Sequence, residues 1–263
     1  MAGQKEKSRA RKPEDCQAAT EIAVFVVPLN RDNSVRRTPW IVFCLVFING
    51  IILLGEYVGG PPQTWFASHG FIPARASVTS AFSSIFLHAG FLHYLGNMFF
   101  LWMFGNRVEN MFGRWLFAFT YFLGGFGGTL FFYALNLHST TPCVGASGAI
   151  SGIVGAFLIL FPWSRFDLDI YLGWARLKTI KTRAYVAVLA WFVEQAVLGL
   201  IISAAHVTGG VAYWAHVGGF AVGAMVAILF TLVYNQKERQ ARDGYESDTR
   251  FEPDPEEFTD LKL

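Results

Sequence analysis

Four polar side chains within apolar stretches have the residue types and spacing needed for acyl transfer. Ser147 lies among glycines and alanines in residues 145–152, and His216 lies in a later apolar run. A serine hydroxyl becomes a nucleophile when an imidazole in hydrogen-bond reach accepts its proton. His93 and Asn97 are four residues apart, hence on one face of a helix, and both can donate hydrogen bonds to a developing oxyanion. These residues predict attack of Ser147 on a carbonyl group, with His216 as the base.

The composition indicates that helices in a membrane must position these groups. The chain has 263 residues, of which 53% are hydrophobic and only 15% are charged. Soluble domains usually carry about a quarter charged residues, and several long apolar runs explain the deficit. We therefore expect an all-α polytopic membrane protein in a lipid bilayer.

Charge and cysteine content narrow the function further. The net charge of +2 gives no reason to expect a nucleic-acid partner. Cys16, Cys44 and Cys143 show neither paired spacing nor the spacing of metal ligands. We therefore expect no disulfide framework, no metal and no cofactor.

Six apolar runs predict six transmembrane helices. Their expected bounds are residues 40–58, 91–104, 115–135, 145–161, 185–202 and 213–234. Residues 39–235 are thus predicted to form one membrane domain, between a basic cytoplasmic segment (1–38) and a charged cytoplasmic tail (236–263). A short apolar run at 22–27 is too brief to span a membrane, and it could form a surface strand.

The connection between the first two predicted spans, residues 59–87, is rich in Gly, Pro, Ser and aromatic residues. It is too apolar for a free linker. Irregular backbone is tolerated at membrane depth only where protein buries it. We expect a partly membrane-immersed loop.

The distribution of Lys and Arg predicts the orientation of the spans. Basic residues gather in the N-terminal segment, in two alternate connections and in the tail, so both termini are expected in the cytoplasm. The second, fourth and sixth spans then begin at the outer face. Their outer ends carry the four polar residues at a similar depth: His93, Asn97, Ser147 and His216.

Small residues predict which helix faces meet. At about 100° per residue, Ser147 shares an arc of roughly 140° with Gly148 and three other small residues. His216 shares a narrower arc with Gly219 and Gly223. Small residues at four-residue spacing allow helices to approach closely in a bilayer. We therefore expect Gly145, Gly148, Gly219 and Gly223 to support the packing that brings Ser147 to His216.

Glu194 lies nearer the middle of the fifth span, and no other acidic residue accompanies His216 at its depth. A Ser–His dyad is therefore expected rather than a triad with a carboxylate. An acidic residue inside a span is a functional candidate by default. A structural and a functional role both remain open for Glu194.

With these residues assembled, the chain resembles the rhomboid family of intramembrane serine proteases over residues 39–235. The matching stretches are FLHAGFLHYLGNM (86–98), FGNRVE (104–109), GASG (145–148) and AHVGGFAVG (215–223). The resemblance implies a six-helix bundle that cleaves transmembrane segments of other membrane proteins without metal or cofactor. It implies Ser147 as nucleophile, His216 as general base, and His93 and Asn97 as oxyanion donors.

The resemblance also implies that the fifth span is a lateral gate for substrate. One difference concerns Ser151, where some family members carry an aromatic residue that stacks on the catalytic histidine. The positioning of His216 is then left to other contacts. A six-span core without a recognisable targeting segment favours a prokaryotic plasma membrane, with the site toward the outer face.

Two other classes remain as alternatives. Intramembrane His, Asn and Glu residues occur in transporters, where they relay protons or bind solutes. The polar groups of this chain stop near one face of the membrane, and no inverted repeat of broken helices is visible. A non-catalytic scaffold that binds transmembrane helices is the second alternative, and it would tolerate the loss of Ser147 and His216.

Overall fold

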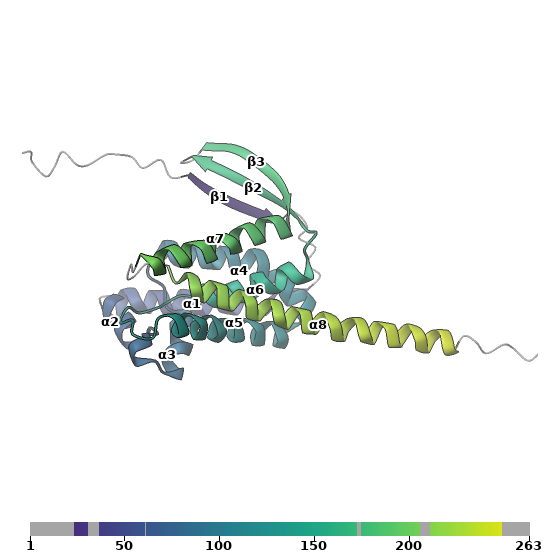
Figure 1. Ribbon diagram of the computed structural model, residues 1–263, viewed down its shortest axis with the longest axis horizontal. Coiled ribbons are helices and arrows are strands. Elements are labelled where there is room, and N and C mark those ends of the chain that lie inside the picture. The colour runs from purple at the N-terminus through teal and green to yellow at the C-terminus, as the bar shows by residue number, and fades with distance from the viewer. Residues whose placement is uncertain (1–23, 31–36, 61, 173–174, 206–210, 249–263) are drawn as a thin grey trace, which may run out of the picture.

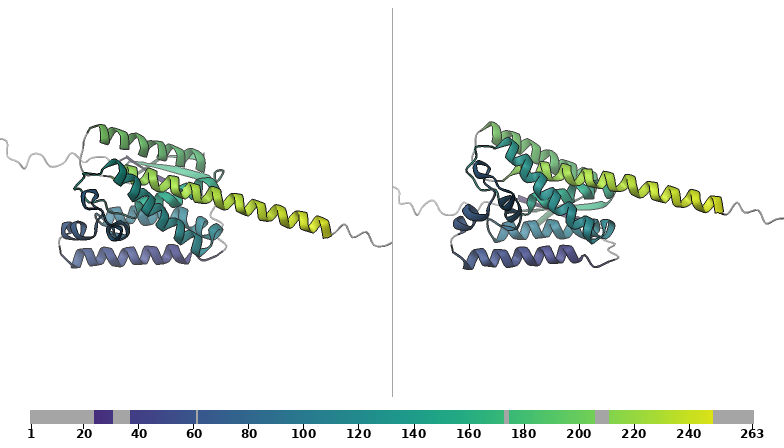
Figure 2. Two further views of the ribbon diagram at one scale, coloured as in Figure 1. Left: turned by 60° about the horizontal axis from the view of Figure 1, so that its bottom comes forward. Right: turned by 90° about the horizontal axis from the view of Figure 1, so that it is seen from below.

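The computed structural model describes residues 24–30, 37–60, 62–172, 175–205 and 211–248. These residues form a helical bundle with a small sheet on one side (Figure 1). The bundle helices are α1 (Trp40–Val58), α4 (Phe91–Phe112), α5 (Arg114–Leu135), α6 (Ser147–Leu160), α7 (Ala184–Ala204) and α8 (Tyr213–Asp248). In both views of Figure 2, α1 and α7 form opposite edges of the bundle.

The polytopic helical class predicted from the sequence is confirmed. Within the described residues, four helices are long and apolar enough to cross a membrane: α1, α5, α7 and the part of α8 from Tyr213 to Gln236. The segment Val78–Phe86 and α4 pass the same test together but are bent by 89°. The helix α6 is apolar but has only 14 residues. All six predicted spans therefore coincide with helices, and the number that crosses the bilayer stays a prediction.

The helix α4 continues to Phe112, past the predicted end at residue 104, because polar residues in its last turns are buried rather than looped out. Glu109 is one of them. Its two carboxylate oxygens accept the backbone N–H groups of Ile41 and Val42 at 3.0 and 2.9 Å. These N–H groups belong to the first turn of α1, where no intrahelical acceptor exists. Glu109 thus caps α1 from a neighbouring helix.

The helix α8 continues to Asp248, beyond the boundary predicted at residue 235. Lys, Glu, Gln, Arg and Ala dominate residues 236–242, and all are good helix formers. The helix projects from the bundle as one straight rod (Figure 1). The predictions made for residues 1–23 and 249–263 lie outside the described residues.

The sheet has three antiparallel strands in the order β1-β2-β3. The strands are β1 (Val24–Asn30), β2 (Arg165–Leu172) and β3 (Ala175–Arg183). The strand expected at 22–27 is confirmed from residue 24 onward, where it pairs with β2. The basic connection expected between the fourth and fifth spans is a β-hairpin. Its first strand is tied to the bundle by Phe166, which is fully buried and contacts the rings of Phe104 and Phe157.

The predicted immersed loop contains short helices: α2 (Pro62–His69), η2 (Pro73–Arg75), α3 (Val78–Ser83) and η3 (Ser84–Phe86). It packs on α5, where Phe82 stacks on Phe122 at 5.7 Å between ring centroids. It also holds the segment before α6, because the Ser84 carbonyl accepts the Gly145 N–H at 2.9 Å. The loop therefore fixes the entry to α6. Its depth in the membrane stays a prediction.

The helix α6 forms the centre of the bundle, with every residue from Gly148 to Leu158 buried. Its glycines face glycines of the neighbouring helices. A Cβ at Gly152 would lie 3.0 Å from Gly124 Cα in α5, and a Cβ at Gly219 in α8 would overlap with the Gly148 carbonyl. Small residues thus let α5 and α8 approach α6 to backbone contact, as their spacing predicted.

Candidate active site

Ser147 is the first residue of α6, and the chain reaches it through a turn that requires glycine. Gly145 has φ +132°, a conformation that side chains with a Cβ rarely adopt. A Cβ there would also lie 2.9 Å from His93 Cε1 and 3.5 Å from Ser147 Oγ. Gly145 therefore brings the Ser147 hydroxyl and the His93 ring to one place.

The structure brings Ser147 and His216 together. His216 Nε2 lies 2.8 Å from Ser147 Oγ, and the histidine is only 9% exposed. The approach depends on the bare backbones below the pair, since Cβ atoms at Gly219 and Gly223 would overlap with the carbonyls of Gly148 and Gly152. Four residues of the interface are thus glycines for steric reasons.

A third group, which the sequence analysis missed, contacts the histidine. Gln195 Oε1 in α7 lies 2.6 Å from His216 Nδ1. An amide oxygen can only accept, so Nδ1 carries the imidazole proton and donates it. Nε2 then has a free lone pair, to which the Ser147 hydroxyl donates. The sequence search considered only acids and so stopped at Glu194, which is exposed on α7.

Polar residues inside apolar spans usually face the bundle interior, and Gln195 satisfies this rule with 7% exposure. That rule was the available signal. The aromatic contact expected from another element is also present, because the Trp191 ring lies 6.2 Å from that of His216 at an interplanar angle of 28°. Ser151 donates instead to the Ser147 carbonyl at 2.7 Å. Both contacts that orient His216 therefore come from α7.

His93 presents a donor to the site. The Ala89 N–H donates to His93 Nδ1 at 3.2 Å, so the proton of the neutral ring is on Nε2. This Nε2–H faces Gly145, since a Cβ there would lie 3.1 Å from it. The ring is held on its other side by His88, with 5.3 Å between ring centroids.

Asn97 lies one turn further along α4, on the same face as His93. It is 8% exposed, and its Nδ2 has no hydrogen-bond partner among the described residues. A buried donor without a partner is costly. Asn97 is thus a free donor next to a residue that already faces Ser147.

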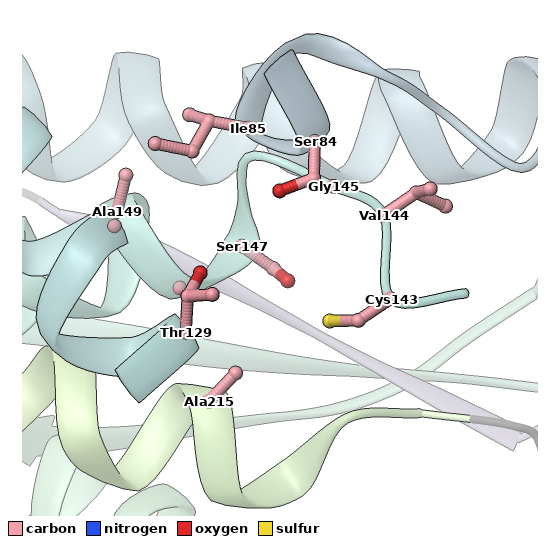
Figure 3. A pocket seen from close by; sticks show the side chains of 11 residues that line it. Ser84, Ile85, Thr129, Cys143, Val144, Gly145, Ser147, Ala149 and Ala215 are labelled. Atoms are coloured by element: carbon pink, nitrogen blue, oxygen red, sulfur yellow. The ribbon is translucent and has the colours of Figure 1, made fainter. Parts of the chain in front are cut away.

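A cavity of about 300 Å³ adjoins the serine. Figure 3 shows the Ser147 side chain at its centre, with side chains from the preceding segment, α5, α8 and the loop around it. The lining includes Ser84, Ile85, Thr129, Cys143, Val144 and Ala215. Most of these side chains are small, so there is space beside the hydroxyl for a compact group.

The fold and the site together define a multi-pass helical membrane protein with a buried Ser–His pair at the end of a central helix. The sequence profile described as Rhomboid domain matches residues 75–233. This match covers more than half of the chain. The chain therefore belongs to the rhomboid family.

Three relatives illustrate the similarity. RHOMBOID-like protein 1 of Arabidopsis thaliana is 32% identical over 158 residues, which is 60% of this chain and 36% of that protein. Rhomboid protein 1, mitochondrial, of Saccharomyces cerevisiae is 31% identical over 193 residues, 69% and 51% of the two chains. Rhomboid protease GluP of Bacillus subtilis is 31% identical over 147 residues, 54% and 27%. The matched region spans only 36%, 32% and 39% of the first three curated relatives.

Proposed function

We propose that this protein is an intramembrane serine endopeptidase that cleaves transmembrane segments of other membrane proteins. The observation that carries the proposal is the 2.8 Å contact between Ser147 Oγ and His216 Nε2 inside a helical membrane bundle. A buried hydroxyl hydrogen-bonded to a correctly protonated imidazole is the arrangement that activates a serine. Membership of a family that includes a relative named as a protease supports the same activity.

The reaction follows from the protonation states of the two side chains. Ser147 Oγ attacks the carbonyl carbon of the scissile amide while its proton passes to His216 Nε2. The tetrahedral intermediate then collapses, and the leaving amine takes the proton from Nε2. Water attacks the resulting acyl ester, gives a proton to His216, and the carboxylate product leaves as Ser147 recovers its proton.

His93 and Asn97 stabilise the oxyanion of both tetrahedral intermediates, in this proposal. The support is the Nε2–H of His93 that faces Gly145 and the unpartnered Nδ2 of Asn97. Backbone N–H groups in the first turn of α6 have no intrahelical acceptor, and Ser147 supplies one of them. Donors that are already in place need no reorganisation when the charge develops.

The substrates are proposed to enter from the bilayer and to carry small or helix-breaking residues near the outer membrane boundary. A helix must unwind locally before its scissile amide can reach Ser147, and exposed backbone is costly in lipid. The compact cavity beside Ser147 favours small side chains. The proposed orientation keeps residues 1–38 and 236–263 in the cytoplasm and the site toward the outer face of a prokaryotic plasma membrane.

The experiment is labelling of the purified protein in detergent with a fluorophosphonate, which modifies an activated serine. Ser147→Ala and His216→Ala should abolish labelling and also cleavage of a reporter transmembrane substrate. Ser151→Ala is the matched control, because Ser151 lies one turn away and its hydroxyl is occupied by a helix carbonyl. It should be labelled like the parent.

If folded parent and folded Ser147→Ala protein behave alike in both assays, the protease proposal fails. Binding of transmembrane helices without cleavage, or transport, would then be the working hypotheses. A pull-down of the reporter substrate by the unlabelled variants separates these two, since only the scaffold retains the substrate.

A further inference from the structure

The contact between Gln195 and His216 involves a residue to which the proposed reaction assigns no role. Gln195 is 7% exposed and His216 is 9% exposed, so their hydrogen bond of 2.6 Å is shielded from water. Because Oε1 can only accept, it selects the tautomer of His216 with the proton on Nδ1. Only this tautomer has a lone pair on Nε2 for the Ser147 proton.

Several packing contacts hold Gln195 opposite the histidine. One turn before it, the Trp191 ring stacks along the His216 ring. One turn after it, Gly199 lies against the Trp214 ring, where a Cβ would come within 3.1 Å of Cε2. All three α7 residues share one face of the helix. The register of α7 against α8 is therefore fixed on both sides of Gln195.

Two more contacts support this register. Phe192 stacks on Phe220 with 4.4 Å between ring centroids. The Trp214 Nε1–H donates to Ser203 Oγ at 2.9 Å. A shift of α7 by one helical turn would move Gln195 by about 5.4 Å and break its hydrogen bond. The position of α7 thus determines whether His216 is held.

We propose that Gln195 is a positioning residue for the general base, with Trp191 holding the plane of the same ring. The inference rests on the proposed function and deepens it. When Ser147 Oγ bonds to the substrate carbonyl carbon, its proton moves to Nε2, and the imidazolium keeps its Nδ1–H on Gln195. When the amine leaves with the Nε2 proton, the original tautomer is restored without rotation of the ring.

The test compares Gln195→Leu and Gln195→Glu with the parent. Leucine has a similar volume and no acceptor, whereas glutamate keeps an acceptor oxygen and adds a negative charge. Glu194→Leu is the matched control, because Glu194 is the adjacent residue and is exposed on α7. The measurements are kcat and KM on a reporter transmembrane substrate, the fluorophosphonate labelling rate between pH 5 and 9, and thermal unfolding.

Gln195→Leu should lower kcat and the labelling rate by about 10- to 100-fold, which is roughly 1.4–2.7 kcal/mol in the activation barrier. KM should not change, because Gln195 acts on the histidine and not on the substrate. Gln195→Glu should keep activity at neutral and alkaline pH and move the acid limb of the pH–rate profile to higher pH, since a carboxylate stabilises the imidazolium. Glu194→Leu should behave like the parent.

The acid limb can be assigned because few other titratable groups lie near the ring. Among the described residues these are His93 of α4 and Tyr213 of α8, whose ring centroid is 6.5 Å away, and neither is altered in the variants. A purely structural role for Gln195 would lower the melting temperature and change both variants alike at every pH.

Three results would overturn the inference. One is Gln195→Leu activity within about twofold of the parent, and another is a loss that appears in KM alone. The third is an unshifted acid limb in Gln195→Glu, which decides the matter if Gln195→Leu does not fold. An active parent with any of these results refutes only the positioning role, whereas a parent without labelling or cleavage refutes the proposed function as well.

Discussion

Replacement of Gly223 by alanine tests whether the contact between α6 and α8 sets the distance between Ser147 and His216. A Cβ at Gly223 would lie 2.6 Å from Gly152 Cα and would overlap with the Gly152 carbonyl. These atoms are backbone, so no side-chain rotation relieves the overlap. The two helices must move apart.

The size of the movement follows from the contact distance. Non-bonded carbon atoms settle at about 3.5–4.0 Å, so the helices must separate by about 1 Å. His216 lies seven residues before Gly223, which is about 10 Å along α8, so a rigid shift reaches it nearly undiminished. The Ser147–His216 contact, now 2.8 Å, would lengthen to about 3.8 Å and leave hydrogen-bond range. A misplacement of about 1 Å can lower activity by roughly 100-fold.

The assay is the rate of fluorophosphonate labelling, with thermal unfolding measured in parallel. Overpacking of this kind typically costs about 1–3 kcal/mol of stability, so the variant should melt lower but still fold. Gly96→Ala is the control, because a Cβ at this glycine of α4 would have no atom within 4 Å. If Gly223→Ala protein is labelled as fast as Gly96→Ala protein, the glycine contact does not set the dyad distance.

Three further results are expected. Asn97→Ala should lower kcat by about 10²–10³-fold at unchanged KM in the cleavage assay, because a donor that acts on the transition state is lost; an equal rise in KM would refute the oxyanion role. Glu109→Ala should lower the free energy of unfolding by about 1–3 kcal/mol, since the N–H groups of Ile41 and Val42 lose their acceptors; an unchanged melting temperature would show that the cap is unimportant. Burial raises the pKa of the Cys143 thiol to about 12, so maleimide should label Cys143 of the folded protein only slowly at pH 7.5 and faster as the pH rises, and rapid labelling by mass spectrometry at pH 7.5 would contradict its burial.

The parts of the site on α6 and α8 were predictable because two local rules determine them. Helical periodicity places Ser147 and His216 on faces that also carry small residues, and small faces pack together in a bilayer. Gly219 and Gly223 do contact the α6 backbone. The turn at Gly145 was predictable only as a packing position, since its φ angle and its proximity to His93 depend on the loop that holds it.

The contribution of α7 was not predictable in the same way. Its apolar residues surround the helix, and no stripe of small residues marks the face that meets α8. The choice of face depends on shape contacts such as Phe192 on Phe220. A search for a carboxylate then favoured Glu194, whereas the structure turns that residue outward and its neighbour Gln195 inward.

The ends of the elements were mispredicted where burial overrides polarity. Glu109 and Asn106 are polar, so the second span was ended at residue 104, yet both are less than 5% exposed within α4. The basic hairpin was interpreted as a connection because its charges dominate its composition. Its alternating sequence RFDLDIYL was the local signal for a strand with one buried face.

The geometry of the candidate site depends on two interfaces of different stiffness. Glycine contacts fix α6 against α8 at backbone distance, so the Ser147–His216 separation can change only if the bundle is forced open. The helix α7 has just four buried residues, Ala184, Val188, Gln195 and Gly199, and the rest of its surface faces outward. Because Gln195 is one of those four, displacement of α7 costs little packing yet removes the partner of His216 Nδ1. The distance for proton transfer is therefore built into the stiff interface, and the protonation state of the base into the soft one.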